Sequence, residues 1–194
     1  MSFKQNKYQV IRNAISYDLA NFCFNYFLLK RDAIKFMYDN NFIAENGMHG
    51  TWKDEQVPGV YSIYADHVME TLLVKTLPVM KEKTGLDLLP TYSYARVYEK
   101  GSILEKHKDR PSCEVSTTIN LGGDLWSIYV EGIKIDLNPG DMLIYAGCEL
   151  EHWREPFEGN ICGQVFLHYN HADGPFAKTN LYDKRPLLGV PNIR

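Results

Sequence analysis

Hydrophobic positions change their spacing along the chain, from helical spacing in the first part to alternation in the second. In residues 16–40, apolar side chains recur near every third or fourth position, and Ser16 is a suitable N-cap. A second helical stretch spans about residues 66–83, with Pro78 as a kink or break and Gly85 as its end. The pattern therefore predicts two helices in the first half of the chain.

The segment between these helices has no apolar period. Residues 40–60 contain Gly47, Gly50, Pro58 and Gly59, which are typical of turns and loops. We expect an irregular loop here. Because loops of this kind often cover binding sites, we also hypothesise that it forms a lid that contributes to specificity.

After Pro90 the apolar residues alternate with polar ones in short runs that are rich in β-branched and aromatic side chains. Glycine and Pro-Gly turns separate these runs. Short strands at this spacing are typical of a closed or nearly closed β-barrel or sandwich, with the helices packed outside it. The predicted strands are 92–98, 114–121, 126–130, 133–137, 142–146 and 163–169.

The length of 194 residues suits one domain with a sizeable core. Hydrophobic residues make up 45% and charged residues 23%, close to globular averages. We therefore expect a single domain, mainly β with flanking helices. Within it, residues 1–90 form mostly helical support, 91–170 form the β core, and 171–194 form an irregular tail.

Charge and cysteine content narrow the function classes. A net charge of -3 gives no electrostatic reason to bind nucleic acid or an acidic membrane surface. The first residues lack an apolar signal core, and no stretch is long enough to span a membrane. The cysteines are scattered without a C-x-x-C pair, so reduced thiols in a cytoplasmic protein are expected. They are Cys23, Cys113, Cys148 and Cys162.

The strongest chemical signal is an H-x-D pair, His107 and Asp109, at the predicted end of a strand, where residues two apart share a face. His152 follows a Pro-Gly turn, a strand and a second turn, and we expect it at the end of that strand. Two imidazoles and one carboxylate on one side of a metal form the facial triad of non-haem iron(II) oxygenases. By itself, the H-x-D pair is equally compatible with ordinary surface residues.

The residues before the H-x-D pair carry a family resemblance. Tyr98, Gly101 and Leu104 precede it at regular spacing, and the segment Thr91–Tyr169 resembles the double-stranded β-helix core, a jelly-roll or cupin-like barrel, of iron(II)- and 2-oxoglutarate-dependent oxygenases. The nearest branch is that of the prolyl 4-hydroxylases. The resemblance implies that the three residues above bind Fe(II) and that 2-oxoglutarate chelates it. It further implies that O2 is used to hydroxylate a C–H bond, with release of succinate and CO2.

The sequence departs from this branch where the cosubstrate's far carboxylate is bound. The branch has a Lys or Arg beyond the distal His, where this chain has Ile161 and Cys162, and no Lys or Arg occurs between Arg154 and Lys178. The expected anchor is therefore missing from its strand.

Other residues are candidates for contacting the cosubstrate. Tyr98 matches the family's cosubstrate-contacting Tyr, and Arg96 shares its face of the strand. Arg154 shares a face with His152 if that strand continues, and Gln164 is a neutral candidate on the last strand. For each arginine, an equally acceptable role is an ordinary ion pair with a neighbouring glutamate, such as Glu99 or Glu155.

His168 and His171 form an H-x-x-H pattern that also resembles a metal pair. On a strand this spacing places the two side chains on opposite faces, so we do not expect them to bind one ion.

Two other function classes remain open. A cupin-like metalloenzyme that does not use 2-oxoglutarate also suits the Pro-Gly-Asp turn followed by a distal His, and so does a non-catalytic barrel that binds a metal or ligand. Within the oxygenase hypothesis, the resemblance favours a peptidyl or amino-acid-like side chain, in a peptide or a small molecule, as the substrate. The sequence leaves the oligomeric state open.

Overall fold

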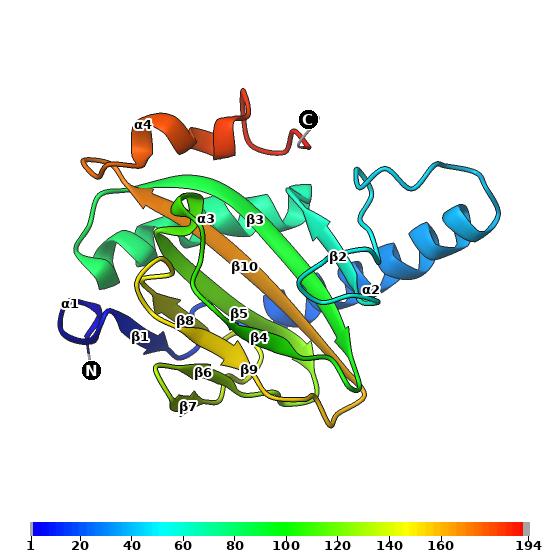
Figure 1. The fold of residues 1–194 in the computed structure, drawn as a ribbon, viewed down its shortest axis with the longest axis horizontal. Coiled ribbons are helices and arrows are strands. Elements are labelled where there is room, and N and C mark those ends of the chain that lie inside the picture. The colour runs from blue at the N-terminus through cyan, green and yellow to red at the C-terminus, as the bar shows by residue number, and fades with distance from the viewer. Residues whose placement is uncertain (1, 192–194) are drawn as a thin grey trace.

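Two antiparallel β-sheets form the centre of the protein in a computed structural model that describes residues 2–191 (Figure 1). The major sheet has six strands in the order β1-β8-β5-β10-β3-β2, and the minor sheet has four in the order β4-β9-β6-β7. This arrangement is a double-stranded β-helix, as the sequence predicts.

The major sheet consists of β1 (Tyr8–Ile11), β2 (Tyr61–Tyr64), β3 (Leu88–Glu99), β5 (Val115–Gly123), β8 (Met142–Tyr145) and β10 (Ile161–His171). The minor sheet consists of β4 (Leu104–His107), β6 (Ile128–Val130), β7 (Ile133–Ile135) and β9 (His152–Arg154). The helices are α1 (Phe3–Asn6), α2 (Tyr17–Asp39), α3 (His67–Thr84) and α4 (Ala177–Asn180), with short 3-10 helices η1 (Pro111–Cys113) and η2 (Leu181–Lys184).

The two long helices cover one face of the major sheet (Figure 1). Phe27 of α2 and Leu73 of α3 share a buried cluster with Ile119 of β5 and with Val165 and Leu167 of β10. These side chains have at most 2% of their surface exposed. This apolar layer supplies most of the core and fixes the sheet against the helices.

Alternation along β10 separates the core from the interior between the two sheets. Val165 and Leu167 face the helices, whereas Gln164, Phe166 and His168 point to the other side, toward the minor sheet. The interior face of the major sheet is therefore the one that carries polar side chains.

Both predicted helices are confirmed. The Ser16 side chain accepts a hydrogen bond from the backbone N–H of Leu19 and begins α2. Gly85, with φ of +72°, ends α3 in the left-handed conformation that glycine tolerates best. Of the predicted kink or break at Pro78, the break is wrong: α3 runs through Pro78, and buried side chains such as Leu73 and Met80 hold the flanking turns.

All six strands that the alternation predicts are present with shifted ends, and the strand expected to end at the H-x-D pair is β4, whereas β1, β2 and β9 are not predicted. β1 and β2 lie in the half predicted to be helical, and each pairs only at the edge of the major sheet, with β8 and β3 respectively. β4 and β9 have four and three residues. Segments this short carry little periodicity, and long-range pairing determines their conformation.

The predicted irregular tail is partly helical. Residues 192–194 of the predicted tail lie outside the described residues. Within residues 171–191, α4 and η2 follow β10, and the buried Arg185 guanidinium pairs with Glu70 of α3 at 2.6 Å. This ion pair fixes the end of the described chain against the helical layer.

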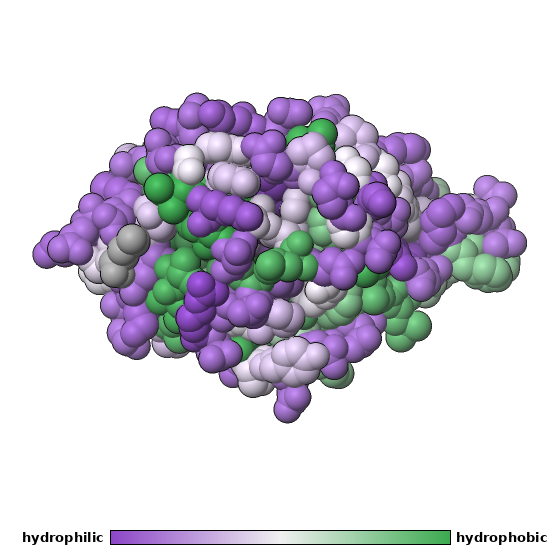
Figure 2. Space-filling view, turned by 90° about the horizontal axis from the view of Figure 1, so that it is seen from below, coloured by the Kyte–Doolittle hydropathy of each residue, from purple (hydrophilic) through white to green (hydrophobic). Residues whose placement is uncertain are grey.

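Most of the face seen in Figure 2 is hydrophilic, and hydrophobic groups on it are interrupted by polar side chains. Among residues 2–191, no helix is both long enough and apolar enough to cross a membrane.

The first prediction concerns Asp66, which joins the two long helices. Its carboxylate accepts hydrogen bonds from the backbone N–H groups of Val68 and Met69, and it also binds Tyr26 and Lys30 of α2, the latter at 2.5 Å. Asp66→Ala should lower the free energy of unfolding by about 2 kcal/mol or more, because α3 loses its N-cap and the α2 groups lose a buried partner. Chemical denaturation measures this change.

Two variants serve as controls for this prediction. Asp66→Asn keeps the capping oxygen and should lose less stability, whereas Asp18→Ala removes an exposed carboxylate in the first turn of α2 and should have little effect. Equal stabilities of Asp66→Ala and wild type would contradict this role.

Candidate metal centre

The register of the minor sheet brings the three predicted ligands together. His107 ends β4, His152 begins β9, and the two residues lie opposite each other in the antiparallel pair. Asp109 lies just beyond the end of β4, and its backbone N–H donates to the carbonyl of Gly147 at 2.9 Å. Two expectations are thus corrected. Asp109 does not lie on β4 itself, and His152 begins β9 rather than ending β8. The turn after β8 lets the chain cross from the major to the minor sheet.

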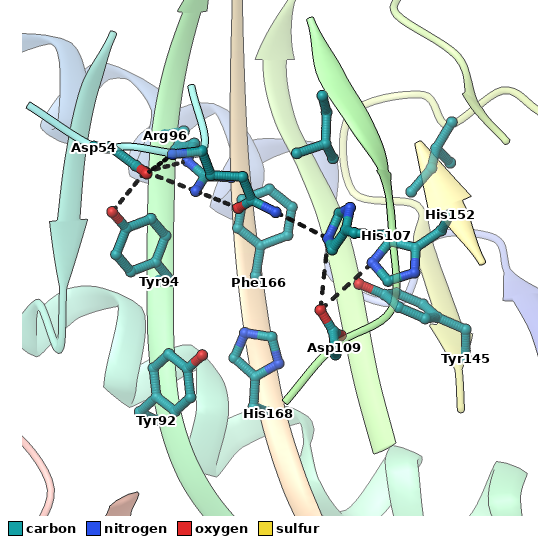
Figure 3. Close-up of a pocket in the computed structure, with 13 residues that line it drawn as sticks. Asp54, Tyr92, Tyr94, Arg96, His107, Asp109, Tyr145, His152, Phe166 and His168 are labelled. Atoms are coloured by element: carbon teal, nitrogen blue, oxygen red, sulfur yellow. Dashed lines mark hydrogen bonds and ion pairs between the residues drawn. The ribbon is translucent and has the colours of Figure 1, made fainter. Parts of the chain in front are cut away.

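The ligand atoms converge on one point (Figure 3). The Nε2 atoms of His152 and His107 lie 3.5 Å and 3.7 Å from Oδ1 of Asp109. The two imidazole rings are 4.2 Å apart, centroid to centroid. Each of the three residues offers a ligand atom, and all three atoms lie within 4.8 Å of one another.

Backbone carbonyls fix both imidazoles in the tautomer that binds a metal. Nδ1 of His107 lies 2.7 Å from the carbonyl of Glu105, and Nδ1 of His152 lies 3.1 Å from that of Leu150. A carbonyl only accepts, so each Nδ1 carries the proton and each Nε2 presents a lone pair. Burial lowers the pKa of His107, which also favours its neutral form.

Asp109 is held with one oxygen turned toward the histidines. The Ser116 hydroxyl donates to Oδ2 at 2.9 Å, and His168 contacts the same hydroxyl through Nδ1 at 2.9 Å. Burial opposes ionisation of Asp109, but His152, His168 and Ser116 together keep the pKa of its carboxyl below the usual value. Asp109 is therefore a carboxylate, with Oδ1 available as a ligand atom.

This donor set fits a divalent cation. Two imidazole lone pairs and a carboxylate oxygen that face each other repel unless a cation lies between them. Neutral imidazoles and one carboxylate are the donors of the iron(II) facial triad, which leaves coordination positions for exogenous ligands.

A second group of candidate ligands, Asp109, Cys113 and His168, shares the same aspartate. Burial raises the pKa of Cys113 well above its ordinary value, and the Tyr92 hydroxyl lies 3.0 Å from its sulfur. A protonated thiol is a poor ligand, and so this group is less suited to a cation than the first one.

The three ligands line a cavity of about 220 Å³ between the sheets (Figure 3). Its other walls come from the inner faces of β3, β8 and β10, from the minor sheet and from the loop that precedes β2. These lining residues are Asp54, Gln56, Tyr92, Tyr94, Arg96, Leu104, Ile128, Tyr145, Phe166 and His168.

Arg96 lies in the cavity wall, but its charge is compensated. Its Nη2 lies 2.6 Å from Oδ2 of Asp54, and Nη1 is 3.3 Å from the Tyr98 hydroxyl. The sequence suggested an ion pair between Arg96 and Glu99. Arg96 instead pairs with Asp54, a residue of the 40–60 loop. Both charged side chains are at least 92% buried.

Arg154 is buried without a carboxylate partner. Only 1% of its surface is exposed, and its Nη1 donates to the carbonyl of Trp126. Among the described residues, neither Nε nor Nη2 has a hydrogen-bond acceptor, and burial lowers the pKa of the guanidinium. The suggested ion pair with Glu155 is not formed, because that side chain accepts from Trp153 instead.

Tyr98 and Gln164 lie in the interior beside the cavity but do not line it. Tyr98 is fully buried, and its ring packs edge-on against Trp126 at 4.7 Å. Gln164 accepts a hydrogen bond from Thr118 at 3.1 Å and donates to the sulfur of Cys162 at 3.2 Å.

Sequence reasoning missed Asp54, Gln56 and His168. The first two lie in a loop without periodicity, and the lid hypothesis identified the segment but not these residues. His168 was set aside because it cannot share an ion with His171. In the structure His168 is buried and faces the cavity, whereas His171 is partly exposed and does not line it, and burial lowers the pKa of His168 to about 4. The available signal is the position of His168 on the last predicted strand, two residues after Phe166 and therefore on the same face.

No protein-family model and no curated protein sequence matches the chain. The fold, however, matches solved structures. A prolyl 4-hydroxylase from Pseudomonas putida superimposes with a TM-score of 0.63 at 15% identity, over 87% of this chain and 95% of that one. The non-haem alpha-ketoglutarate-dependent epimerase SnoN from nogalamycin biosynthesis gives 0.66 at 10% identity, over 97% of this chain and 91% of that one.

A viral collagen prolyl hydroxylase from Paramecium bursaria Chlorella virus-1, solved with 2-oxoglutarate, gives a TM-score of 0.57 at 12% identity, over 84% of this chain and 96% of that one. At these identities the similarity establishes a shared fold. The predicted double-stranded β-helix fold is thereby confirmed.

The second prediction concerns Gly147, which lies against the carboxylate of Asp109. A Cβ atom at this position would lie 2.3 Å from Oδ2 of Asp109 and 2.4 Å from the carbonyl of Cys113. Gly147→Ala should therefore displace the carboxylate and weaken Co²⁺ binding by about tenfold or more, since ligand orientation controls affinity. Isothermal titration calorimetry with Co²⁺ measures the effect.

Gly132→Ala is the matched control for this prediction. It strains a turn with φ of +81° but meets nothing within 4 Å, so it should cost stability without changing Co²⁺ affinity. Wild-type affinity in Gly147→Ala would contradict the assignment of Asp109.

Proposed function

We propose that this protein is an iron(II)- and 2-oxoglutarate-dependent oxygenase whose metal is bound by His107, Asp109 and His152. The observation that carries the proposal is the convergence of two imidazole Nε2 atoms and one carboxylate oxygen in a single cavity. The shared fold with 2-oxoglutarate-dependent oxygenases supports it.

The protein's own contribution is to present and shield the donors. The carbonyls of Glu105 and Leu150 retain the Nδ1 protons, and Ser116 holds the outer oxygen of Asp109. His152 is only 2% exposed, which limits access of bulk water. With these ligands, a bound iron ion and 2-oxoglutarate supply oxidation of a substrate C–H bond by O2, with succinate and CO2 as coproducts.

Arg154 is the residue that we assign to the far carboxylate of 2-oxoglutarate. It lies two residues after His152 on the same face of β9, about 7 Å along a strand. That separation is comparable with the length of a five-carbon dicarboxylate bound to the metal at its other end. Leu104, which lies opposite Arg154 across the strand pair, lines the cavity. Unpaired Nε and Nη2 groups are well suited to a bidentate carboxylate.

This assignment accounts for the missing basic residue on β10. Cys162 lies on the interior face of that strand, opposite Tyr98, and both side chains lie close enough to Arg154 to affect the pKa of its guanidinium. A second long basic side chain at position 162 would compete with Arg154 for the same buried space. The guanidinium therefore replaces, from the neighbouring sheet, the anchor that prolyl 4-hydroxylase-like enzymes carry on the last strand.

Arg96 is less suited to bind the cosubstrate because Asp54 already compensates its charge. It lies on the side of the cavity closed by the 40–60 loop, where we expect the substrate. Tyr98 and Gln164 lie deeper and complete the polar surroundings of the cosubstrate through a hydroxyl and an amide.

The substrate that best fits this lining is a peptidyl or amino-acid-like side chain. The cavity combines aromatic walls, including Tyr92 and Phe166, with the polar groups of Tyr94 and His168. Its small volume, part of which 2-oxoglutarate would occupy, favours one side chain over a large ligand.

Because the four cysteines of the chain are free thiols, we propose that the protein acts in a reducing compartment such as the cytoplasm.

One observation favours a second candidate, a cupin-like metalloenzyme that does not use 2-oxoglutarate. β10 lacks a basic residue, so a site without a dicarboxylate is chemically consistent with that strand. A barrel that binds a metal or ligand without catalysis would share the same triad. Binding of 2-oxoglutarate to the metal-loaded protein separates the first proposal from both.

The third prediction is catalytic. After anaerobic loading with Fe(II), exposure to O2 in the presence of 2-oxoglutarate should yield succinate. The rate of succinate formation should be slow without a primary substrate and higher with a substrate that the enzyme hydroxylates. His107→Ala should reduce the rate by at least about 100-fold, because an iron ligand is lost. Succinate is quantified by mass spectrometry. Wild type that forms no more succinate than His107→Ala would refute the proposed activity.

The fourth prediction separates the two arginines. Arg154→Met should weaken 2-oxoglutarate binding by about 100-fold, because charge-assisted hydrogen bonds are lost. It should also raise the free energy of unfolding by about 1–3 kcal/mol, because a buried guanidinium with unsatisfied N–H groups is removed. Calorimetric titration and chemical denaturation measure the two quantities.

Arg31→Met is the control for 2-oxoglutarate affinity, since Arg31 pairs with Asp32 and Glu99 and does not line the cavity. Arg96→Lys tests the rival anchor. If Arg96→Lys loses 2-oxoglutarate affinity while Arg154→Met keeps it, the assignment of Arg154 is wrong.

A further inference from the structure

The 40–60 loop makes a hydrogen bond to a proposed metal ligand. The side-chain amide nitrogen of Gln56 lies 3.0 Å from Nε2 of His107. Its Oε1 accepts from Nη2 of Arg96 at 2.7 Å, which fixes the amide with its NH2 group toward the histidine. Because Nδ1 of His107 carries the proton, Gln56 donates to the Nε2 lone pair.

This lone pair is the one that the proposed iron ion requires. A neutral imidazole has a single acceptor nitrogen, and its lone pair cannot bind both a metal ion and an amide N–H. Gln56 and a divalent cation therefore compete for the same atom of His107.

Gln56 does not move independently of its surroundings. Asp54 accepts hydrogen bonds from the Tyr94 hydroxyl at 2.8 Å, from Nε of Arg96 at 2.8 Å and from the backbone N–H of Gln56 at 2.9 Å. Asp54, Gln56 and Arg96 thus form one connected network in the cavity wall, which we call the 54–56 latch after its two loop residues (Figure 3). A change at His107 is therefore transmitted through Gln56 to Arg96 and Asp54.

We infer that Gln56 is a positioning residue that couples occupancy of the metal site to the conformation of the 40–60 loop. Without a cation, Gln56 holds His107 in its ligand tautomer and fastens the loop across the cavity. Cation binding takes the lone pair, releases the Gln56 amide and loosens the 54–56 latch on the side where substrate enters. Thermodynamic linkage makes the effect reciprocal: the latch lowers metal affinity to the same extent that the metal loosens the latch.

The inference rests on the proposed metal site and is tested with Co²⁺ alone, without any turnover. Gln56→Ala should bind Co²⁺ about two- to tenfold more tightly than wild type in calorimetric titrations, the range expected for one net hydrogen bond. Gln5→Ala, the same replacement at an exposed position in α1, should bind Co²⁺ like wild type. Unchanged or weaker Co²⁺ binding by Gln56→Ala would overturn the inference.

Amide hydrogen exchange supplies the second measurement. Saturating Co²⁺ should speed exchange severalfold in peptides covering residues 53–59 of wild type, where the backbone N–H groups of Gln56 and Gly59 are hydrogen-bonded within the loop. Asp54→Asn should speed exchange there without Co²⁺, because it weakens the ion pair with Arg96. Exchange that is unchanged or slower with Co²⁺ would contradict the coupling.

The two claims fail in different ways. If wild type and every variant bind no Co²⁺, the proposed metal centre fails and the inference fails with it. If wild type binds Co²⁺ through His107 but Gln56→Ala binds no more tightly, only the coupling is lost and the metal centre stands.

Discussion

The antiparallel pairing of β4 with β9 is the constraint on which the site depends. This short pair sets His107 opposite His152 and Leu104 opposite Arg154, with an irregularity between them. Both imidazoles and the guanidinium therefore face the same interior, and Asp109 follows directly where β4 ends. The Gly147 carbonyl and the Ser116 hydroxyl then fix the carboxylate. A shift of one residue in this register would turn the ligands away from the cavity.

Charge compensation divides the interior into two regions. On the loop side, Asp54 and Arg96 are buried together and satisfy each other, so that region is stable as it stands. At the inner end, Arg154 is buried with two unsatisfied groups, which is a cost to folding. Functional sites often retain such a cost because a ligand compensates it when bound. The contrast between the two arginines is the physical basis for assigning Arg154 to an anionic cosubstrate and Arg96 to the cavity mouth.

The sequence predicted those features that depend on local pattern. Helical spacing with caps at Ser16 and Gly85 located the two long helices, alternation located six strands, and the H-x-D pair with a distal His identified residues that the structure brings together. Features set by long-range contacts were out of reach. The edge strands and β9 are too short to show a period, and Gln56 reaches His107 from a loop 51 positions away. The sequence could propose both arginines but could not tell which one finds a carboxylate within the chain.

The central claim is that one divalent metal ion binds between His107, Asp109 and His152 with 2-oxoglutarate extending to Arg154. The most direct measurement is an anomalous difference map, recorded at the iron absorption edge, from crystals grown anaerobically with Fe(II) and 2-oxoglutarate. The account predicts one peak within bonding distance of both Nε2 atoms and of Oδ1 of Asp109, with the far carboxylate against the Arg154 guanidinium. A peak at Cys113 and His168 instead, or no peak in the cavity, would contradict it.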